Sequence, residues 1–172
     1  MWQLTSALFY LHEQKLVCHR DLKGENTLIS SSGRRLLISD FGCAKRFAQG
    51  EVTADCGGGT RCFKPPEALL LRAHGPRERD IWSLAATFFV MMTGRLPFGD
   101  GSCGTETLVL RQRRRSFTFL PKSGLGSLSD ELDSLLAQMF MYPWEGRPDV
   151  PAVRRHPYWQ QQAKKFRKRE HE

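Results

Sequence analysis

Residues 78–92 constrain the fold of this chain most, because they would form a helix that is apolar nearly all round. A helix without a polar face cannot lie on a surface and has to be surrounded by other elements. We therefore predict a central, buried helix that ends before Gly94 and acts as the scaffold of the molecule. Its apolar side chains are Ile81, Trp82, Leu84, Ala85, Phe88, Phe89, Val90 and Met91.

The other segments predict a mainly α protein with one short β-hairpin. Two β-compatible runs, residues 27–29 and 36–38, are separated by a polar stretch with Gly33, which suits a hairpin. Residues 43–66 and 116–129 are rich in glycine or proline and predict loops. The remaining expected helices are residues 2–14, residues 67–71, residues 107–114, one capped by Ser129 and Asp130, and a last short helix whose start is bracketed by Pro148 and Pro151.

Size and composition suit one globular domain with one core. The chain has 172 residues, of which 40 % are apolar. The longest apolar run, residues 81–92, is too short to cross a bilayer, and the N-terminus lacks the basic start of a signal peptide. Five cysteines without regular spacing indicate neither a disulfide framework nor a zinc site, and favour a reducing compartment. We expect no membrane partner and a cytoplasmic or nuclear location.

Residues 18–26 gather charged and polar side chains in a short stretch between two apolar segments. Asp21 and Asn26 offer hard oxygen ligands or acceptors. Lys23 is a mobile positive charge, and the guanidinium of Arg20 is a fixed fork. This set suits a reaction that moves a highly charged group, and phosphoryl transfer fits best.

These residues also carry a resemblance to a known family. The motif His19-Arg20-Asp21-Leu22-Lys23-x-x-Asn26 resembles the catalytic loop of eukaryotic protein kinases, and Asp40-Phe41-Gly42 resembles their magnesium loop. The resemblance implies a Ser/Thr protein kinase that transfers the γ-phosphate of ATP to Ser or Thr hydroxyls of a protein substrate, with ATP and Mg²⁺ as cofactors. It also implies a protein-kinase-like α+β fold.

The resemblance assigns a role to each polar residue of the two loops. Asp21 would orient the substrate hydroxyl and accept its proton. Lys23 would contact the transferred phosphate, a pattern of Ser/Thr kinases, while Asn26 and Asp40 would hold Mg²⁺. The hairpin would bring Asp40 back beside Asn26. Taken alone, an aspartate such as Asp21 is more often a solvated loop residue.

Two further segments extend the resemblance. Residues 59–67 resemble the substrate-binding loop that ends in Ala-Pro-Glu, with Pro65 in place of the alanine. Thr60 would hydrogen-bond near Asp21 and Lys23, and Glu67 would pair with Arg147. The alternative for Glu67 is a plain first-turn helix acid.

Residues 80–85 resemble the start of the central kinase helix, where Asp80 would cap backbone amides of the catalytic loop. Ala85 replaces the usual glycine, and we expect its methyl group to be tolerated. His19 and Phe41 would be packing groups of the apolar stack that joins the two kinase lobes, rather than reactive ones.

Arg20 suggests regulation, since in kinases with an Arg-Asp pair the arginine can receive a phosphate from the activation loop. Thr53 carries the only hydroxyl between Gly42 and Gly59. Its neighbours Glu51 and Asp55 would repel an added phosphate.

The resemblance maps residues 1–160 onto the C-terminal lobe of a kinase and leaves residues 161–172 as a basic tail. No Gly-x-Gly-x-x-Gly loop and no Val-Ala-x-Lys strand occur in the sequence, so half of the nucleotide cradle is missing. We therefore expect this chain to be inactive by itself, either as a fragment or as a truncated product. The face toward the N-terminal lobe would need that lobe or a covering partner.

Other assignments stay open at this point. Residues 93–98 resemble calmodulin-dependent kinases, particularly testis-specific ones, whereas residues 23–26 and 32–36 are also compatible with kinase-kinase-kinase relatives. We favour the former. The rival function is a non-catalytic, kinase-like interaction module that docks protein partners.

The formal net charge of +8 is concentrated in two places and leaves the body nearly neutral. Nucleic acid is therefore not the expected partner, and such binding would have to be salt-sensitive and depend on the tail at residues 164–169. The basic side chains involved are Arg111, Arg113, Arg114, Arg115, Lys164, Lys165, Arg167, Lys168 and Arg169.

Overall fold

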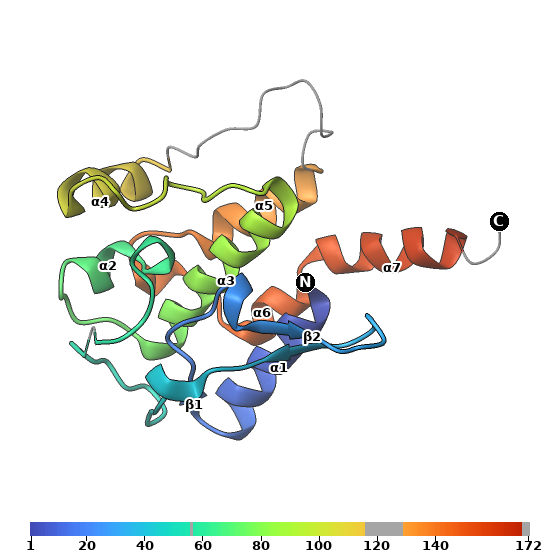
Figure 1. The fold of residues 1–172 in the computed structure, drawn as a ribbon, viewed down its shortest axis with the longest axis horizontal. Coiled ribbons are helices and arrows are strands. Elements are labelled where there is room, and N and C mark those ends of the chain that lie inside the picture. Colours follow the sequence, from blue (N-terminus) through green and yellow to red (C-terminus); the bar gives the residue numbers. More distant parts are fainter. Residues whose placement is uncertain (56, 116–128, 170–172) are drawn as a thin grey trace.

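The computed structural model describes residues 1–55, 57–115 and 129–169, and the chain is mainly helical in these ranges (Figure 1). The helices are α1 Trp2–Phe9, α2 Pro66–Leu69, α3 Pro76–Thr93, α4 Thr105–Arg113, α5 Asp130–Met139, α6 Val150–Arg155 and α7 Pro157–Arg169. The strands are β1 Val17–Cys18, β2 Thr27–Ile29, β3 Leu36–Ile38 and β4 Lys45–Arg46. Within these ranges no helix combines the length and the apolar character that a bilayer span requires.

Helix α3 is the central element that the sequence predicted, and most of the other helices lie around it, whereas α7 does not (Figure 1). It ends at Gly94, whose φ of 67° gives the left-handed cap that glycine adopts without strain. Trp82 stacks on Phe98 and meets the edge of Phe140, so the buried helix is held by aromatic rings from the segments that follow it. One expectation was wrong, because Met91 near the end of the helix is 43 % exposed. The helix reaches the surface at its last turn.

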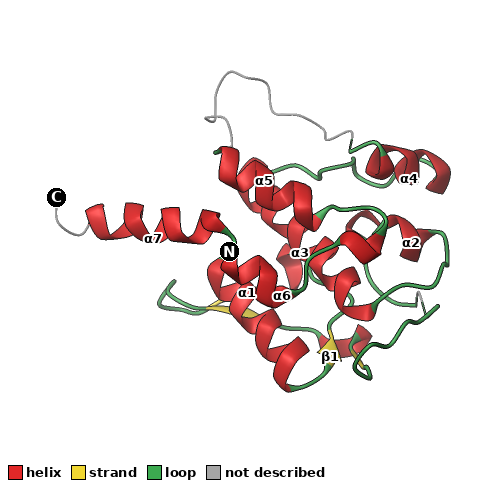
Figure 2. Ribbon diagram, turned by 180° about the vertical axis from the view of Figure 1, so that it is seen from behind, coloured by secondary structure: helices red, strands yellow, loops and turns green. Residues whose placement is uncertain are grey.

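Helix α1 carries Leu4 and Leu8 into the core and continues as a wider, π-helical turn at Tyr10–Gln14. It lies beside α6, as the view from behind shows (Figure 2). The wider turn places His12 inside the molecule, where it is fully buried. This segment therefore delivers the chain directly to the catalytic-loop residues.

The predicted hairpin is confirmed with the expected strand limits. Strands β2 and β3 pair antiparallel, Leu28 lies opposite Leu37, and Gly33 in the turn has a φ of 69°. A second antiparallel ladder, β1 with β4, was not predicted. Each of its strands has two residues, too short for an alternating pattern to be visible in a sequence.

The C-terminal part differs most from expectation. The predicted caps are present, since Ser129 accepts from the backbone N–H of Leu132 and starts α5. However, residues that were predicted as a basic tail belong to an additional helix, α7, which runs away from the body (Figure 1). Its start is anchored by Trp159, whose Nε1 donates to the carbonyl of Val153 at 2.8 Å. The loop predicted at 116–129 lies outside the described residues except for Ser129.

Candidate active site

The loop at residues 18–26, called the catalytic loop below after the motif that it resembles, is held by one buried carboxylate. This is the carboxylate of Asp80 in α3, which is 0 % exposed. Its Oδ2 accepts from the backbone N–H of His19 at 2.7 Å, and its Oδ1 accepts from that of Arg20 at 2.7 Å. His12 Nε2 lies 2.9 Å from the same Oδ2. Burial acts to raise the pKa of Asp80, but the hydrogen bonds and charge of His12 and the two amides outweigh it and lower this pKa. The loop is thus tied to the core through its backbone.

The side chain of Asp21 is the point where the other loops converge. Its Oδ1 accepts from the backbone N–H of Thr60 at 2.7 Å, and Asn26 Nδ2 donates to its Oδ2 at 3.2 Å. Lys23 Nζ lies 3.2 Å from that Oδ2. Burial acts to raise the pKa of Asp21, but the hydrogen bonds from Thr60 and Lys23 outweigh it and lower this pKa. An ionised, fixed carboxylate of this kind can accept a hydrogen bond from a hydroxyl and orient it.

Thr60 is held against the catalytic loop from two sides. Lys23 Nζ donates to Thr60 Oγ1 at 2.6 Å, while the Thr60 amide contacts Asp21. The preceding residue, Gly59, has a φ of 82°, and a Cβ built on it would lie 2.4 Å from the carbonyl oxygen of Arg20. Only glycine permits this close approach of two backbones. The structure therefore brings Asp21, Lys23, Asn26 and Thr60 together.

The Asp40 turn lies beside the same site but is less firmly held. Ser39 donates to the carbonyl of Asn26 through its backbone N–H at 2.9 Å and through its Oγ at 3.1 Å, which brings the end of β3 back to the catalytic loop. Asp40 itself is exposed, has a φ of 60°, and accepts from its own neighbour Gly42 N at 3.1 Å. The Phe41 ring meets the His19 ring edge-on, with centroids 5.0 Å apart.

Oxygen atoms suited to Mg²⁺ are available in these two loops. Among the described residues no hydrogen bond reaches Oδ1 of Asn26 or Oδ2 of Asp40. An amide oxygen and a carboxylate oxygen are hard ligands, which Mg²⁺ prefers. The chemistry of this donor set fits the ion.

The structure also contains a cluster of potential metal-ligand side chains that the sequence did not predict. His12, Cys18 and Asp80 place one ligand atom each within 4.8 Å of one another, the only such group of three in the described ranges. Asp80 already accepts three hydrogen bonds, and burial together with the charge of Asp80 raises the pKa of the Cys18 thiol. These properties fit a packed structural cluster. The sequence gives no signal for this cluster, because its three residues come from three separate segments.

Glu67, at the end of residues 59–67, forms a buried ion pair with Arg147. Arg147 Nη1 lies 2.8 Å from Glu67 Oε1 and donates to the carbonyl of Glu78 at 2.7 Å. The guanidinium also lies over the Trp82 ring, 5.0 Å from its centroid. Glu67 is at the same time a first-turn acid of α2, so both interpretations of the sequence apply to one side chain.

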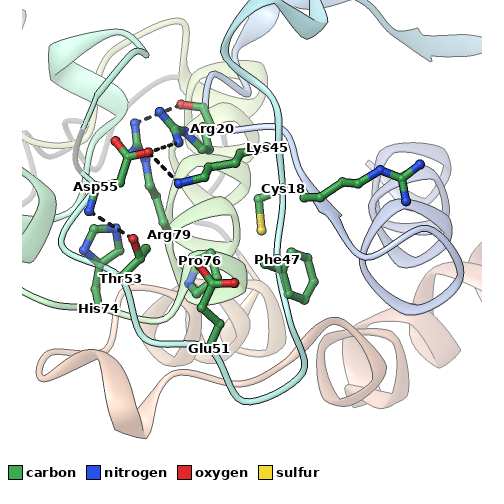
Figure 3. A pocket seen from close by; sticks show the side chains of 11 residues that line it. Cys18, Arg20, Lys45, Phe47, Glu51, Thr53, Asp55, His74, Pro76 and Arg79 are labelled. Atoms are coloured by element: carbon green, nitrogen blue, oxygen red, sulfur yellow. Dashed lines mark hydrogen bonds and ion pairs between the residues drawn. The ribbon is translucent and has the colours of Figure 1, made fainter.

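Arg20 contacts a residue that the sequence had not selected, Asp55. Its Nη1 lies 2.9 Å from Asp55 Oδ2 (Figure 3). Thr53, which the sequence singled out, lies two residues away, and its Oγ1 accepts from the backbone N–H of Asp55 at 3.0 Å. Its backbone also pairs with His74 in both directions. In the sequence, Asp55 was only a neighbour that would repel a phosphate.

Comparisons with known proteins show which family this chain is similar to. The family model described as protein kinase domain matches residues 1–159. Sperm motility kinase 2B of Mus musculus is 35 % identical over 157 residues, which is 91 % of this chain and 30 % of that protein. Serine/threonine-protein kinase SRK2F of Arabidopsis thaliana is 32 % identical over 161 residues, which is 91 % of this chain and 44 % of that protein.

The chain thus spans less than half the length of the curated relatives it matches. Sperm motility kinase 3A of Mus musculus is similar to the same extent, with 33 % identity over 157 residues, 91 % of this chain and 29 % of that protein. The family model covers nearly all of the described core, and the relatives include serine/threonine kinases. This chain therefore belongs to the eukaryotic Ser/Thr protein kinase family.

Proposed function

We propose that residues 1–160 form the large lobe of a Ser/Thr protein kinase and supply the groups that act on the substrate hydroxyl. The observation that carries this proposal is the Asp21 carboxylate, which Thr60 N and Asn26 Nδ2 hold at 2.7 and 3.2 Å. A carboxylate fixed by donors on two loops is preorganised to orient a hydroxyl, which is what phosphoryl transfer asks of the protein.

The other residues take complementary roles. Lys23 lies beside the Asp21 carboxylate and bridges to Thr60 at 2.6 Å, where a positive charge can stabilise a phosphoryl group that is being transferred. Asn26 and Asp40 would hold Mg²⁺ through their open oxygens. The ion would neutralise charge that develops on the phosphoryl oxygens of ATP. The substrate class that Lys23 and Thr60 favour is a Ser or Thr hydroxyl in a protein.

One observation favours the need for a covering partner. On one face of the hairpin, Leu28 and Leu37 lie directly opposite each other and are 51 % and 53 % exposed. Such a patch in water indicates a surface that another element covers. We infer that a kinase N-terminal lobe, or a partner protein in its place, covers this face when nucleotide binds. Phe41, in the turn after the hairpin, is also exposed, at 47 %.

The same patch also keeps the second candidate function open, a non-catalytic module that docks protein partners. Titration calorimetry of the whole chain with Mg-ATP separates the two. We expect saturable binding that needs Mg²⁺ and is lost in Asp40→Ala, because this substitution removes a carboxylate ligand. Glu145→Ala removes an exposed acid elsewhere and should bind like the unmodified chain. Absence of binding by the unmodified chain would favour the docking module.

A further inference from the structure

Asp55 is in contact with two basic side chains next to the catalytic loop. Its Oδ2 lies 2.9 Å from Arg20 Nη1 and 3.1 Å from Lys45 Nζ. Arg20 directly precedes Asp21 in the chain, and its side chain is only 12 % exposed. A carboxylate therefore already neutralises the arginine that stands beside the proposed catalytic residue. Figure 3 shows Arg20 and Lys45 both directed at Asp55.

The second oxygen of Asp55 holds the backbone of the following loop. Its Oδ1 accepts from the backbone N–H of Gly57 at 3.0 Å, while Arg20 Nη2 donates to the carbonyl of Gly57 at 2.6 Å. Arg79 adds a third support, because its Nη2 donates to the carbonyl of Gly58 at 2.8 Å. Gly57 is thus held on both sides, by Asp55 at its N–H and by Arg20 at its carbonyl.

From this point the contacts continue to the catalytic carboxylate. Gly58 and Gly59 follow directly, and Gly59 lies against the carbonyl of Arg20. The next residue, Thr60, donates its backbone N–H to Asp21. Asp55 and Asp21 are therefore connected through only four residues, 57–60, of which Gly57 contacts Asp55 and Thr60 contacts Asp21.

Arg20, Thr53 and Asp55 line one hollow in the surface (Figure 3), and the hydroxyl and backbone of Thr53 are already engaged there. Its Oγ1 accepts from Asp55 N, and its N–H and C=O both pair with His74 at 2.9 Å. Glu51, which also lines the hollow, accepts from the backbone N–H of Ala48 at 2.7 Å. A phosphate on Thr53 would bring a second anion next to Asp55, and the like charges would repel each other.

We propose that Asp55 is a built-in positioning residue that orders the loop at residues 57–60 against Asp21 without a phosphate on Thr53. The inference rests on the proposed function for its purpose, since it names how that site is regulated. The Asp55 carboxylate supplies the anion that Arg20 and Lys45 contact, with one negative charge where a phosphate group would carry nearly two. The loop is then assembled as soon as the chain folds.

Hydrogen exchange of the whole, unphosphorylated chain, followed by mass spectrometry, tests this proposal without nucleotide or activity. Residues 57–60 should be protected in the unmodified chain, and Asp55→Ala should exchange there faster by on the order of tenfold. Amides of α3 serve as the internal standard, because loss of their protection would report unfolding. Asp55→Asn keeps the shape of the side chain but removes its charge, and residues 57–60 should also lose protection in this variant. It serves as the test if Asp55→Ala does not fold.

Inorganic phosphate provides a rescue that a merely structural role would not show. In Asp55→Ala, Arg20 and Lys45 lose their anion, so added phosphate should bind there and restore protection of residues 57–60. The double variant Asp55→Ala with Arg20→Ala should not respond, and Asp55→Glu should stay protected without phosphate. Glu51→Ala removes another acid of the same hollow and should behave like the unmodified chain.

Two results would overturn the proposal. One is a loop at 57–60 that exchanges equally fast with and without the Asp55 carboxylate. The other is protection that arises only after Thr53 is phosphorylated, which Thr53→Val would abolish. Neither result depends on Mg-ATP binding, and Asp40→Ala should leave the loop protected. Failure of the positioning role is therefore distinguishable from failure of the proposed kinase function.

Discussion

Asp80 and Asp40 both lie next to the catalytic loop, yet the environments of their side chains are opposite. Asp80 is 0 % exposed on the central helix and accepts hydrogen bonds from His12, His19 and Arg20. Asp40 is exposed on a turn and accepts one hydrogen bond, from Gly42. The core of this chain thus holds the side of the site proposed to act on the substrate, while the side proposed to bind Mg²⁺ offers an open carboxylate. Three predictions break or sharpen this contrast.

The largest expected effect follows from removing the buried acid. Asp80→Ala leaves two backbone amides and a histidine without their acceptor inside the protein, which should cost about 3–5 kcal/mol of unfolding free energy. Asp40→Ala removes an exposed carboxylate and should change stability little. Urea unfolding of both variants measures the difference. Equal losses would show that the buried carboxylate does not anchor the loop.

A smaller effect is expected where the two loops approach each other. Gly59→Ala forces a Cβ to within 2.4 Å of the Arg20 carbonyl at a φ of 82°, and should cost about 2–3 kcal/mol. Gly33→Ala is the matched control, because its φ of 69° is similar but nothing lies within 4 Å. It should cost about 1 kcal/mol through backbone strain alone. If both variants unfold at the same urea concentration, the close approach has no energetic weight.

The smallest expected effect is the change in folding stability at low pH. The pKa values of Asp80 and Asp21 are lowered in the folded chain, so their ionised forms stabilise it at every pH above the unfolded value of about 4. This stabilisation is lost as pH falls from there through the folded pKa values. The stability difference between the unmodified chain and Asp80→Asn should therefore shrink between pH 6 and pH 3. A difference that grows toward pH 3 in urea unfolding would contradict the sign.

Local patterns in the sequence predicted several elements correctly. The all-round apolar pattern located α3, two β-compatible runs around Gly33 located the hairpin, and Ser129 located the start of α5. Each of these signals lies within one continuous segment, where periodicity and capping express themselves directly. The short β1–β4 ladder and helix α7 lacked such a signal, the first because it is brief and the second because its basic composition suggested a tail.

The resemblance to kinase motifs assigned the expected roles of the site residues, and the structure adds which of their atoms meet. The sequence singled out Asp21, Lys23, Asn26 and Thr60, and these converge in space. It did not select Asp55, since the same side chain can repel a phosphate on Thr53 or replace one at Arg20. Spacing along the chain cannot distinguish these two outcomes.

By itself, then, the sequence determined the family, the central helix and the identity of the polar residues in the catalytic loop. Only the tertiary structure decided which partners each charge has, for example that Asp55 meets Arg20 across 35 positions and Asp80 meets His12 across 68. The physical reason is that charges and hydrogen bonds act over a few ångströms in space. Contacts between distant segments therefore exist only after the core around α3 has brought those segments together.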